Sequence, residues 1–320
     1  MKAAVYYRTG APDVFVYEDV PDPSVGPNAV LIAVEAISIE GGDTLNRLGG
    51  AMTATPHIVG YQCAGTIQQV GKDVVDREVG QRVVATMASG SHAELVAVPA
   101  GGTWLIPEGL DTEVAACVPI AFGTADDCLF EFGRLRAGEA VLVQAGAGGV
   151  GLAAIQLAKR AGATVLATAS TADKLERLSG FGLDHGINYS TDDFADVARR
   201  LTAGRGVDLV VDSVGSTLAG SVRALAYRGR ISYVGNAGRG SAPLEVSALM
   251  GGNQSICGVF LGAELVAGDR AHANITRLID LVAAGELQVV IDRRFPLAEA
   301  ASAHAHMEDR QAFGRVVLVP

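Results

Sequence analysis

The spacing of apolar and polar positions changes once along the chain, near Thr112. Before that point, short runs rich in β-branched residues are bounded by Gly, Pro or Asp, and helical periodicity is weak. We therefore expect a predominantly β domain, formed as a curled sheet or a partly open barrel. The predicted strands are KAAVYY, AVLIAVEAISI, CAGTIQQVG, QRVVATM and HAELVAVP.

After Thr112, helical patterns alternate with apolar strands. The run TEVAACVPIAFGTADDCLFEF is helix-like, and the predicted strands that follow are AVLVQAG, TVLATAS, HGINY, VDLVVDSVG and RISYVGN. The helical patterns between them include GVGLAAIQLAKRAG, DKLERLSGFG, DFADVARRLTAG and LAGSVRALAYRG. This rhythm predicts βαβ units, and so an α/β domain whose doubly wound parallel sheet is covered by helices on both faces.

The last part of the chain has one more helical pattern, ANITRLIDLVAAGEL, and ends on the strand-like VVLVP, which has the texture of the first domain. We expect the chain to return there. The predicted domains are residues 1–113, the β domain; 114–258, the doubly wound domain; and 259–320, the return to the first domain.

Composition narrows the class of protein. The chain has 320 residues, 49% of them hydrophobic, and no apolar run approaches the roughly 20 residues of a membrane span. The amino terminus lacks the features of a secretory signal, so we expect a cytoplasmic protein. A net charge of −10 without a Lys/Arg cluster argues against nucleic acid as a partner. The four scattered cysteines predict free, mostly buried thiols.

A glycine fingerprint carries the most specific signal. Gly146, Gly148 and Gly151 satisfy G-x-G-x-x-G directly after an apolar strand and before a helix. In that context the glycines allow a tight turn, close approach to a pyrophosphate and close packing of helix on strand. The helix start adds free N–H groups for phosphate. The alternative is a glycine-rich turn without a ligand. The predicted phosphate loop comprises Gly146, Ala147, Gly148, Gly149, Val150 and Gly151.

The end of the next strand should select the cofactor, because NAD sites place an Asp or Glu there. Here the strand ends in Ala169 and Ser170, Lys174 follows, and Tyr189 closes the third strand. A cation beside small hydroxyl residues favours a 2′-phosphate, and hence NADPH. Asp173 weakens this prediction slightly, although a residue at a helix start is more often a cap.

As a set, these features resemble the zinc-independent quinone oxidoreductases of the medium-chain dehydrogenase/reductase superfamily, the group that includes zeta-crystallin. The resemblance covers the whole chain and rests on MKAAVYY, GTA at 123–125, GEAVLVQAGAGGVG, INY, VDLVVDSVG, GRISYVGNA and FGRVVLVP. It implies a GroES-like β domain with a Rossmann domain, and a homodimer formed through the Rossmann domains near SICGVF.

The resemblance also implies roles for individual residues. Lys174 and Tyr189 would hold the 2′-phosphate, Ser170 would lie at the adenosine phosphate, and Thr124 would lie close to nicotinamide and substrate. The residues implied at the nicotinamide end are Ser213, Val214, Gly215, Gly235, Asn236, Phe260, Leu261 and Gly262.

No metal site is expected. In the zinc-dependent alcohol dehydrogenases of the superfamily, a Cys stands at the position of Glu40 and a His-Glu pair at Tyr61 and Gln62, while the third ligand position falls in VPIAFGTA, which offers none. One carboxylate cannot build a catalytic zinc site with three protein ligands.

The chemistry that remains is hydride transfer to an electrophile that delocalises the developing charge, such as a quinone or an α,β-unsaturated carbonyl compound. Candidate donors to the developing oxygen anion are Tyr61, Thr124, Arg47 and Asn46. For Arg47, a structural salt bridge, with Asp43 as one partner, is the alternative. Tyr61 has packing as its alternative.

Glu40 stands where most relatives of the resembled family carry an Asn near the cofactor. A carboxylate in a water-poor cleft should have a raised pKa and could act as donor or general acid. The alternative is a Glu that binds the turn backbone or pairs with a cation. His304 and His306 lie in a helix-like segment that we expect to form a solvated face, and His57 could line the cleft but more often would not.

The sequence therefore predicts an NADPH-dependent, zinc-independent oxidoreductase acting on quinones or enones. The rivals are an enoyl-thioester reductase, although no basic patch for a CoA or phosphopantetheine tail is evident, and a non-catalytic NADPH-binding protein.

Overall fold

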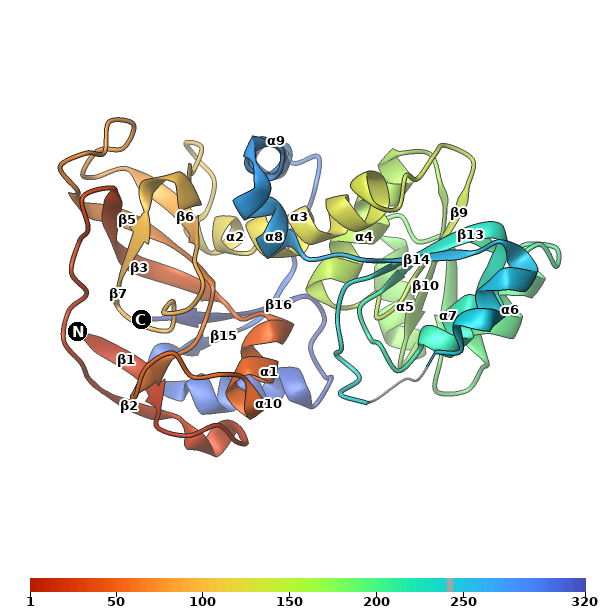
Figure 1. Ribbon diagram of the computed structural model, residues 1–320, viewed down its shortest axis with the longest axis horizontal. Helices are drawn as coiled ribbons and strands as arrows, with labels where there is room; N and C mark the ends of the chain where they lie inside the picture. The colour runs from red at the N-terminus through yellow and green to blue at the C-terminus, as the bar shows by residue number, and fades with distance from the viewer. Residues whose placement is uncertain (241–243) are drawn as a thin grey trace. The chain divides into compact units, whose positions relative to one another are not determined.

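The computed structural model describes residues 1–240 and 244–320 (Figure 1). The chain forms two compact units, one of Met1–Ile120 with Ile275–Pro320 and one of Ala121–Asn274. These units are defined by contacts between residues, so the predicted domain boundaries remain predictions. In the described ranges, no helix combines the length and the apolar character that a membrane crossing requires.

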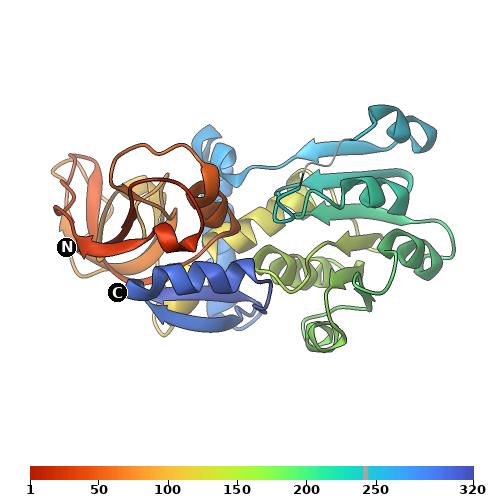
Figure 2. The same ribbon diagram turned by 90° about the horizontal axis from the view of Figure 1, so that it is seen from below.

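The first unit is built on β sheets. A seven-stranded sheet runs in the order β15-β16-β3-β5-β6-β8, with β7 paired to β3, and a smaller sheet runs β2-β1-β4. Figure 2 shows the C-terminal elements in blue beside the N-terminal ones in red within this unit. The strands are β1 (Lys2–Tyr6), β2 (Val16–Asp19), β3 (Ala29–Ser38), β4 (His57–Ile58), β5 (Gln62–Val70), β6 (Arg82–Thr86), β7 (Leu95–Pro99), β8 (Thr103–Leu105), β15 (Ile291–Pro296) and β16 (Arg315–Val319).

The long strand β3 organises this unit. It pairs antiparallel with β5, β7 and β16, and its apolar side chains enter one buried cluster with those of β5, β6 and β16. The β3–β5 register shifts between Val34 and Ala36. A Cβ on Gly65 would come closer than 3.0 Å to the Ala33 carbonyl oxygen, so the two backbones need a glycine there.

The second unit contains a six-stranded parallel sheet in the order β11-β10-β9-β12-β13-β14 (Figure 1). Helix α4 packs on β9 and β10, α7 packs on β12 and β13, and α6 contacts α7. The predicted doubly wound parallel sheet and the predominantly β character of the first unit are confirmed. The strands are β9 (Ala140–Val143), β10 (Thr164–Ala169), β11 (His185–Asn188), β12 (Val207–Asp212), β13 (Leu225–Tyr233) and β14 (Ser255–Gly258).

The α-helices are α1 (Gly41–Gly49), α2 (Thr112–Ala116), α3 (Pro119–Asp126), α4 (Gly149–Arg160), α5 (Ala172–Ser179), α6 (Phe194–Leu201), α7 (Leu218–Ala224), α8 (Leu261–Ala267), α9 (Asp269–Ala283) and α10 (Ala300–Glu308). Short 3-10 helices are η1 (Pro12–Val14), η2 (Ala100–Gly102), η4 (Val246–Gly252) and η5 (Leu297–Glu299), and a π-helical turn, η3 (Asp127–Glu131), continues α3.

Three local predictions were wrong. The helix predicted over LAGSVRALAYRG ends at Ala224, and β13 begins at Leu225 with an irregular register against β12. The helix-like run after Thr112 is broken before Pro119, which has no N–H to continue it, and resumes as α3. His304 does not lie on a solvated face: its side chain is fully buried.

Candidate functional site

The predicted phosphate loop joins β9 to α4 and leaves no room for side chains at two of its glycines. A Cβ on Gly151 would come closer than 3.0 Å to the Ala145 carbonyl, and one on Gly146 would lie 2.9 Å from Ala167 Cβ. At Gly148 the nearest atom would be 3.4 Å away, so that glycine is not required by the protein's own packing. A ligand that approaches the backbone would require it, as in a dinucleotide site.

The ends of β10 and β11 bring together the residues predicted to choose the cofactor. These strands are neighbours, with Ala169 paired to Asn188, so Ser170 and Tyr189 follow adjacent strand ends. Thr171 caps α5 and accepts a hydrogen bond from Lys174 N at 3.3 Å. The Tyr189 side chain is 42% exposed. This part of the sheet edge offers a lysine and a tyrosine, and the nearby carboxylate, Asp173, lies in the first turn of α5.

The loops after β12 and β13 also meet. Gly215 has φ +81°, and a Cβ there would lie 2.9 Å from Asn236 Oδ1. Within the described residues this Oδ1 is buried and accepts no hydrogen bond. A buried acceptor without a partner costs free energy, and a ligand amide, such as a nicotinamide carboxamide, would satisfy it. The predicted loop therefore fits a dinucleotide.

Three more predicted residues follow β14. Phe260 caps α8 and is 74% exposed, while Leu261 is buried and begins the helix. Gly262 lies next to the Phe260 ring, because a Cβ there would be 2.8 Å from Phe260 Cζ. All the predicted cofactor residues thus follow carboxyl ends of β9, β10, β11, β12, β13 or β14, the edge at which parallel sheets bind ligands.

In the first unit, Glu40 lies in a buried polar cluster. It is 3% exposed, it forms an ion pair with Arg315, and it accepts a hydrogen bond from Gln62 Nε2. Arg315 also donates from Nε to Ser38 Oγ at 3.0 Å and from Nη2 to the Ile39 carbonyl at 2.8 Å. Burial raises the pKa of Glu40, whereas Arg315 and Ser38 act in the opposite direction. The cluster gives Glu40 a cation partner, which the sequence had left as one alternative.

Asp43 lies beside this cluster at the start of α1. Its Oδ2 accepts from Glu40 N at 2.8 Å, whereas its buried Oδ1 has no hydrogen-bond partner in the described chain. Burial raises the pKa of Asp43 well above its usual range, whereas the hydrogen bond from the Glu40 backbone lowers it and the Glu40 charge raises it by less. The Tyr61 hydroxyl packs against Gly42, where a Cβ would lie closer than 3.0 Å to it. Burial, Asp43 and Glu40 together raise the pKa of Tyr61 well above its usual value.

The other predicted donors occupy different surroundings. Arg47 is fully buried and forms an ion pair with Glu308 of α10, where the sequence had suggested Asp43 as a partner. Thr124 is buried in α3, and Asn46 is exposed on α1. His57 is 5% exposed, and its ring lies 5.1 Å from that of Tyr6.

Sequence reasoning missed Arg315 and Cys117. Arg315 lies 275 positions from Glu40 and reaches it because β16 pairs with β3, with Val317 opposite Ser38. Burial raises the pKa of Cys117, with smaller effects from Arg315 and Ser38, so this thiol also belongs to the cluster. The sequence could have indicated Arg315 only through the requirement that a buried Glu40 has a cation as its partner. In the residues that the structure describes, no group of three or more His, Cys, Asp and Glu side chains could hold a metal ion.

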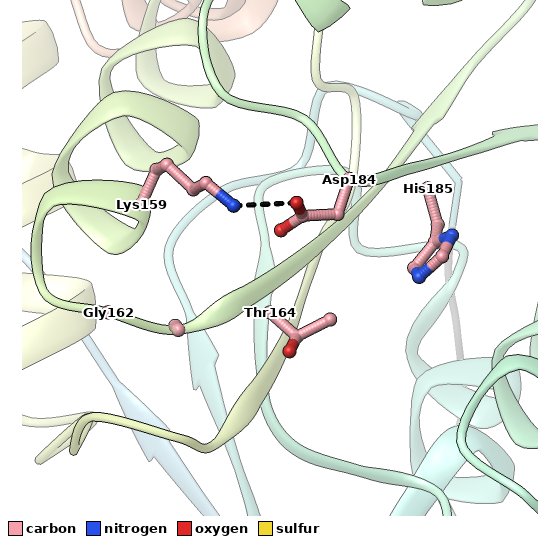
Figure 3. A pocket seen from close by; sticks show the side chains of 6 residues that line it. Lys159, Gly162, Thr164, Asp184 and His185 are labelled. Atoms are coloured by element: carbon pink, nitrogen blue, oxygen red, sulfur yellow. Dashed lines mark hydrogen bonds and ion pairs between the residues drawn. The ribbon is translucent and has the colours of Figure 1, made fainter.

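One pocket of the second unit lies away from the predicted site. Figure 3 shows Lys159 paired with Asp184 beside Thr164 and His185. Thr164 and His185 are the first residues of β10 and β11, so this pocket is at the amino ends of the strands. Dinucleotides bind at the opposite edge of such sheets, and the pocket is therefore not part of the candidate site.

Comparison with known proteins covers both units. Residues 26–108 match the family described as "Alcohol dehydrogenase GroES-like domain" and residues 149–284 the one described as "Zinc-binding dehydrogenase". A 2-haloacrylate reductase from a Burkholderia species is 35% identical over 328 residues, which is 99% of this chain and 98% of that protein.

Solved structures are also similar to this chain. A mycobacterial protein solved in complex with NADPH is 34% identical, with a TM-score of 0.95 and full coverage of both chains. The Escherichia coli quinone oxidoreductase, also solved with NADPH, is 26% identical, with a TM-score of 0.94 and full coverage of both chains.

Proposed function

Because the chain belongs to the medium-chain dehydrogenase/reductase superfamily, as a quinone oxidoreductase-like NAD(P)H-dependent oxidoreductase, we propose that it uses NADPH to reduce quinones or α,β-unsaturated carbonyl compounds. One observation carries the proposal. The glycine fingerprint, the Lys174 and Tyr189 pair and the orphaned Asn236 acceptor all follow carboxyl ends of strands in one parallel sheet.

In this proposal the phosphate loop, Gly146 to Gly151, and the start of α4 bind the pyrophosphate. Lys174 and Tyr189 bind the 2′-phosphate, with Ser170 beside them. The remaining contacts, at the nicotinamide end, come from Ser213, Val214, Gly215, Gly235, Asn236, Phe260, Leu261 and Gly262. The cofactor supplies a hydride, and the chain supplies orientation and exclusion of water.

The reduction of a quinone or enone also requires a proton. We propose that Tyr61, Thr124 and Arg47 stabilise the developing oxygen anion and that Glu40 is the proton donor. The raised pKa of Glu40 supports a donor role, whereas its ion pair with Arg315 favours the charged, non-donating form. Glu40→Gln separates the two, because a donor role predicts a fall in kcat and a changed pH profile, while a structural role leaves both unchanged.

The substrate class is open to a direct assay. The 2-haloacrylate reductase relative acts, by its name, on an alkene conjugated to a carboxylate, which supports activated alkenes as substrates here. Cofactor oxidation should be followed with a quinone, an enone, 2-chloroacrylate and an enoyl thioester. Turnover with the first three supports the proposal. Turnover confined to the thioester would favour an enoyl-thioester reductase, and tight NADPH binding without any turnover would favour a non-catalytic binding protein.

The choice of cofactor has its own test. Lys174→Ala should raise the KM for NADPH about 10- to 100-fold, since a hydrogen bond to a charged group contributes roughly 1.5–3 kcal/mol. The KM for NADH should not change. Lys72→Ala is the matched control, because Lys72 is an exposed lysine of the other unit. A wild-type preference for NADH would refute the NADPH assignment.

We further propose a cytoplasmic homodimer whose subunits meet through their Rossmann domains near β14. This strand lies at one end of the six-stranded sheet, so one side of it has no strand partner among the described residues. Sedimentation of the purified chain, with Ile256→Lys as a variant of that strand, tests the arrangement.

A further inference from the structure

The carboxylate of Asp212 is the centre of a buried hydrogen-bond network beneath the predicted cofactor loops. Asp212 is the last residue of β12 and is fully buried. Its Oδ1 accepts from Val214 N and Gly215 N, each at 3.0 Å, and from Thr217 Oγ1 at 2.8 Å. Its Oδ2 accepts from Thr217 Oγ1 at 2.9 Å and Ser221 Oγ at 2.8 Å.

These bonds fix the loop that follows β12. Two of the donors are the backbone amides of Val214 and Gly215, residues predicted to line the nicotinamide end. A carboxylate that accepts several hydrogen bonds fixes the positions of the groups that donate to it. Asp212 therefore fixes the backbone of the loop that follows it at Val214 and Gly215.

The network continues to the phosphate loop. Gln144 Nε2 donates to Ser221 Oγ at 3.3 Å, Thr168 Oγ1 donates to Gln144 Oε1 at 2.8 Å, and Ala145 N donates to Thr168 Oγ1 at 3.1 Å. The side chains of Gln144, Thr168 and Ser221 are all at most 1% exposed. The chain of bonds thus links the ends of β9, β10 and β12 in the interior of one unit.

All the donors in this chain point the same way. The amide of Ala145 donates to Thr168, which donates to Gln144, which donates to Ser221, which donates to Asp212. Bonds aligned in this way polarise one another, and each hydroxyl proton is committed to one partner. The carboxylate of Asp212 is the terminal acceptor of this chain of bonds.

We propose that Asp212 is a positioning residue for the nicotinamide half of the cofactor, held in place by a chain of hydrogen bonds that begins at Ala145. This rests on the proposed use of a nicotinamide dinucleotide. Ala145 has φ +52°, a conformation that a non-glycine residue holds only when its surroundings fix it, and its bond to Thr168 is one such constraint.

Asp212→Asn is the informative substitution because it keeps the size of the side chain. One oxygen can still accept from Val214 and Gly215, but the new amide then faces Ser221 as a donor. Ser221 Oγ must then accept from this amide as well as from Gln144 Nε2, and its own proton loses its acceptor. The change therefore acts on the order of the network more than on its volume.

The test compares two ligands with one variant set. Wild type, Asp212→Asn and Ser221→Ala are titrated by calorimetry with NADPH and with 2′-phospho-ADP-ribose, which lacks the nicotinamide. The matched control is Ser179→Ala, which removes an exposed hydroxyl of the same unit. Hydride transfer is then timed in single turnovers with protio and deuterio NADPH and 1,4-benzoquinone.

We expect Asp212→Asn to weaken NADPH binding about tenfold and to leave the half-ligand within about twofold of wild type, since the network contributes on the order of 1 kcal/mol per bond. Single-turnover hydride transfer should slow about tenfold, with the isotope effect retained. Ser221→Ala should weaken NADPH binding roughly threefold and leave the half-ligand unchanged. This variant therefore tests the proposal if Asp212→Asn does not fold.

The proposal is overturned if both ligands weaken equally, or if neither changes while the melting temperature falls, because either result describes a residue that only supports the fold. Wild-type protein that fails to bind NADPH would refute the proposed function instead. The two failures are therefore distinguishable.

Discussion

Acid should destabilise this protein through a buried pair of histidines in the first unit, His92 and His304. Both rings are fully buried, and their Nε2 atoms lie 3.0 Å apart. A hydrogen bond with the Val59 backbone favours the protonated form of His92, and burial opposes that form more strongly. Phe15 packs edge-on against His304, with ring centroids 4.8 Å apart.

The magnitude follows from linkage. Burial lowers the pKa of His92 from 6.5 to about 3, and burial, His92 and Arg47 lower that of His304 well below 6.5. His92 is therefore neutral in the folded protein at pH 5, whereas both histidines are protonated in the unfolded chain. Stability is fully present above pH 6.5 and is lost as the pH falls. A histidine with the lowered pKa of His92 costs about 2 kcal/mol between pH 8 and pH 5, and His304 adds a cost of the same sign.

Urea unfolding at pH 8 and at pH 5 measures this. The double variant His92→Gln/His304→Gln should lose at least about 2 kcal/mol less than wild type over that interval. His185→Gln, which changes a histidine of the other unit, is the control and should behave as wild type. The comparison between variants is needed because Glu40 and Asp43, whose pKa values are raised, bind protons first in the folded state and so oppose the loss. Equal pH dependence in wild type and double variant would refute the reasoning.

The remaining predictions concern the phosphate loop and the Glu40 cluster. Gly151→Ala should destabilise the fold by roughly 1–3 kcal/mol through its contact with the Ala145 carbonyl. Gly148→Ala should melt as wild type but lose affinity for NADPH, as measured by calorimetry. Equal melting temperatures in the two variants would contradict this prediction. Glu40→Ala should cost about 3–5 kcal/mol by leaving Arg315 buried and unpaired, and Glu40→Leu/Arg315→Met should recover part of that in urea unfolding. Losses that simply add in the double variant would argue against the pair.

The doubly wound sheet could be predicted because its signals are local. Each strand from AVLVQAG onward is a short apolar run, and the glycines at Gly146 and Gly151 are demanded by contacts within about twenty residues. The helix predicted across Leu225 failed because tertiary pairing with β12 decided the matter over local propensity.

The Glu40 cluster could be predicted only in part. The sequence indicated that Glu40 needed either a raised pKa or a cation, but Arg315 comes near it only through the pairing of β16 with β3. His304 failed for a related reason. Its helix, α10, buries that position against Phe15 and His92, which come from distant parts of the chain, and no spacing within the helix reports them.

The guanidinium of Arg315 has a consequence for how the protein depends on its surroundings. It is bonded at once to Ser38, Ile39 and Glu40, so the countercharge of the buried carboxylate is encoded in the chain itself. A dissolved cation at such a carboxylate would follow its own concentration and could be removed by a chelator. A covalently attached one keeps the same occupancy in metal-rich and metal-starved cells, and it is inherited with the sequence.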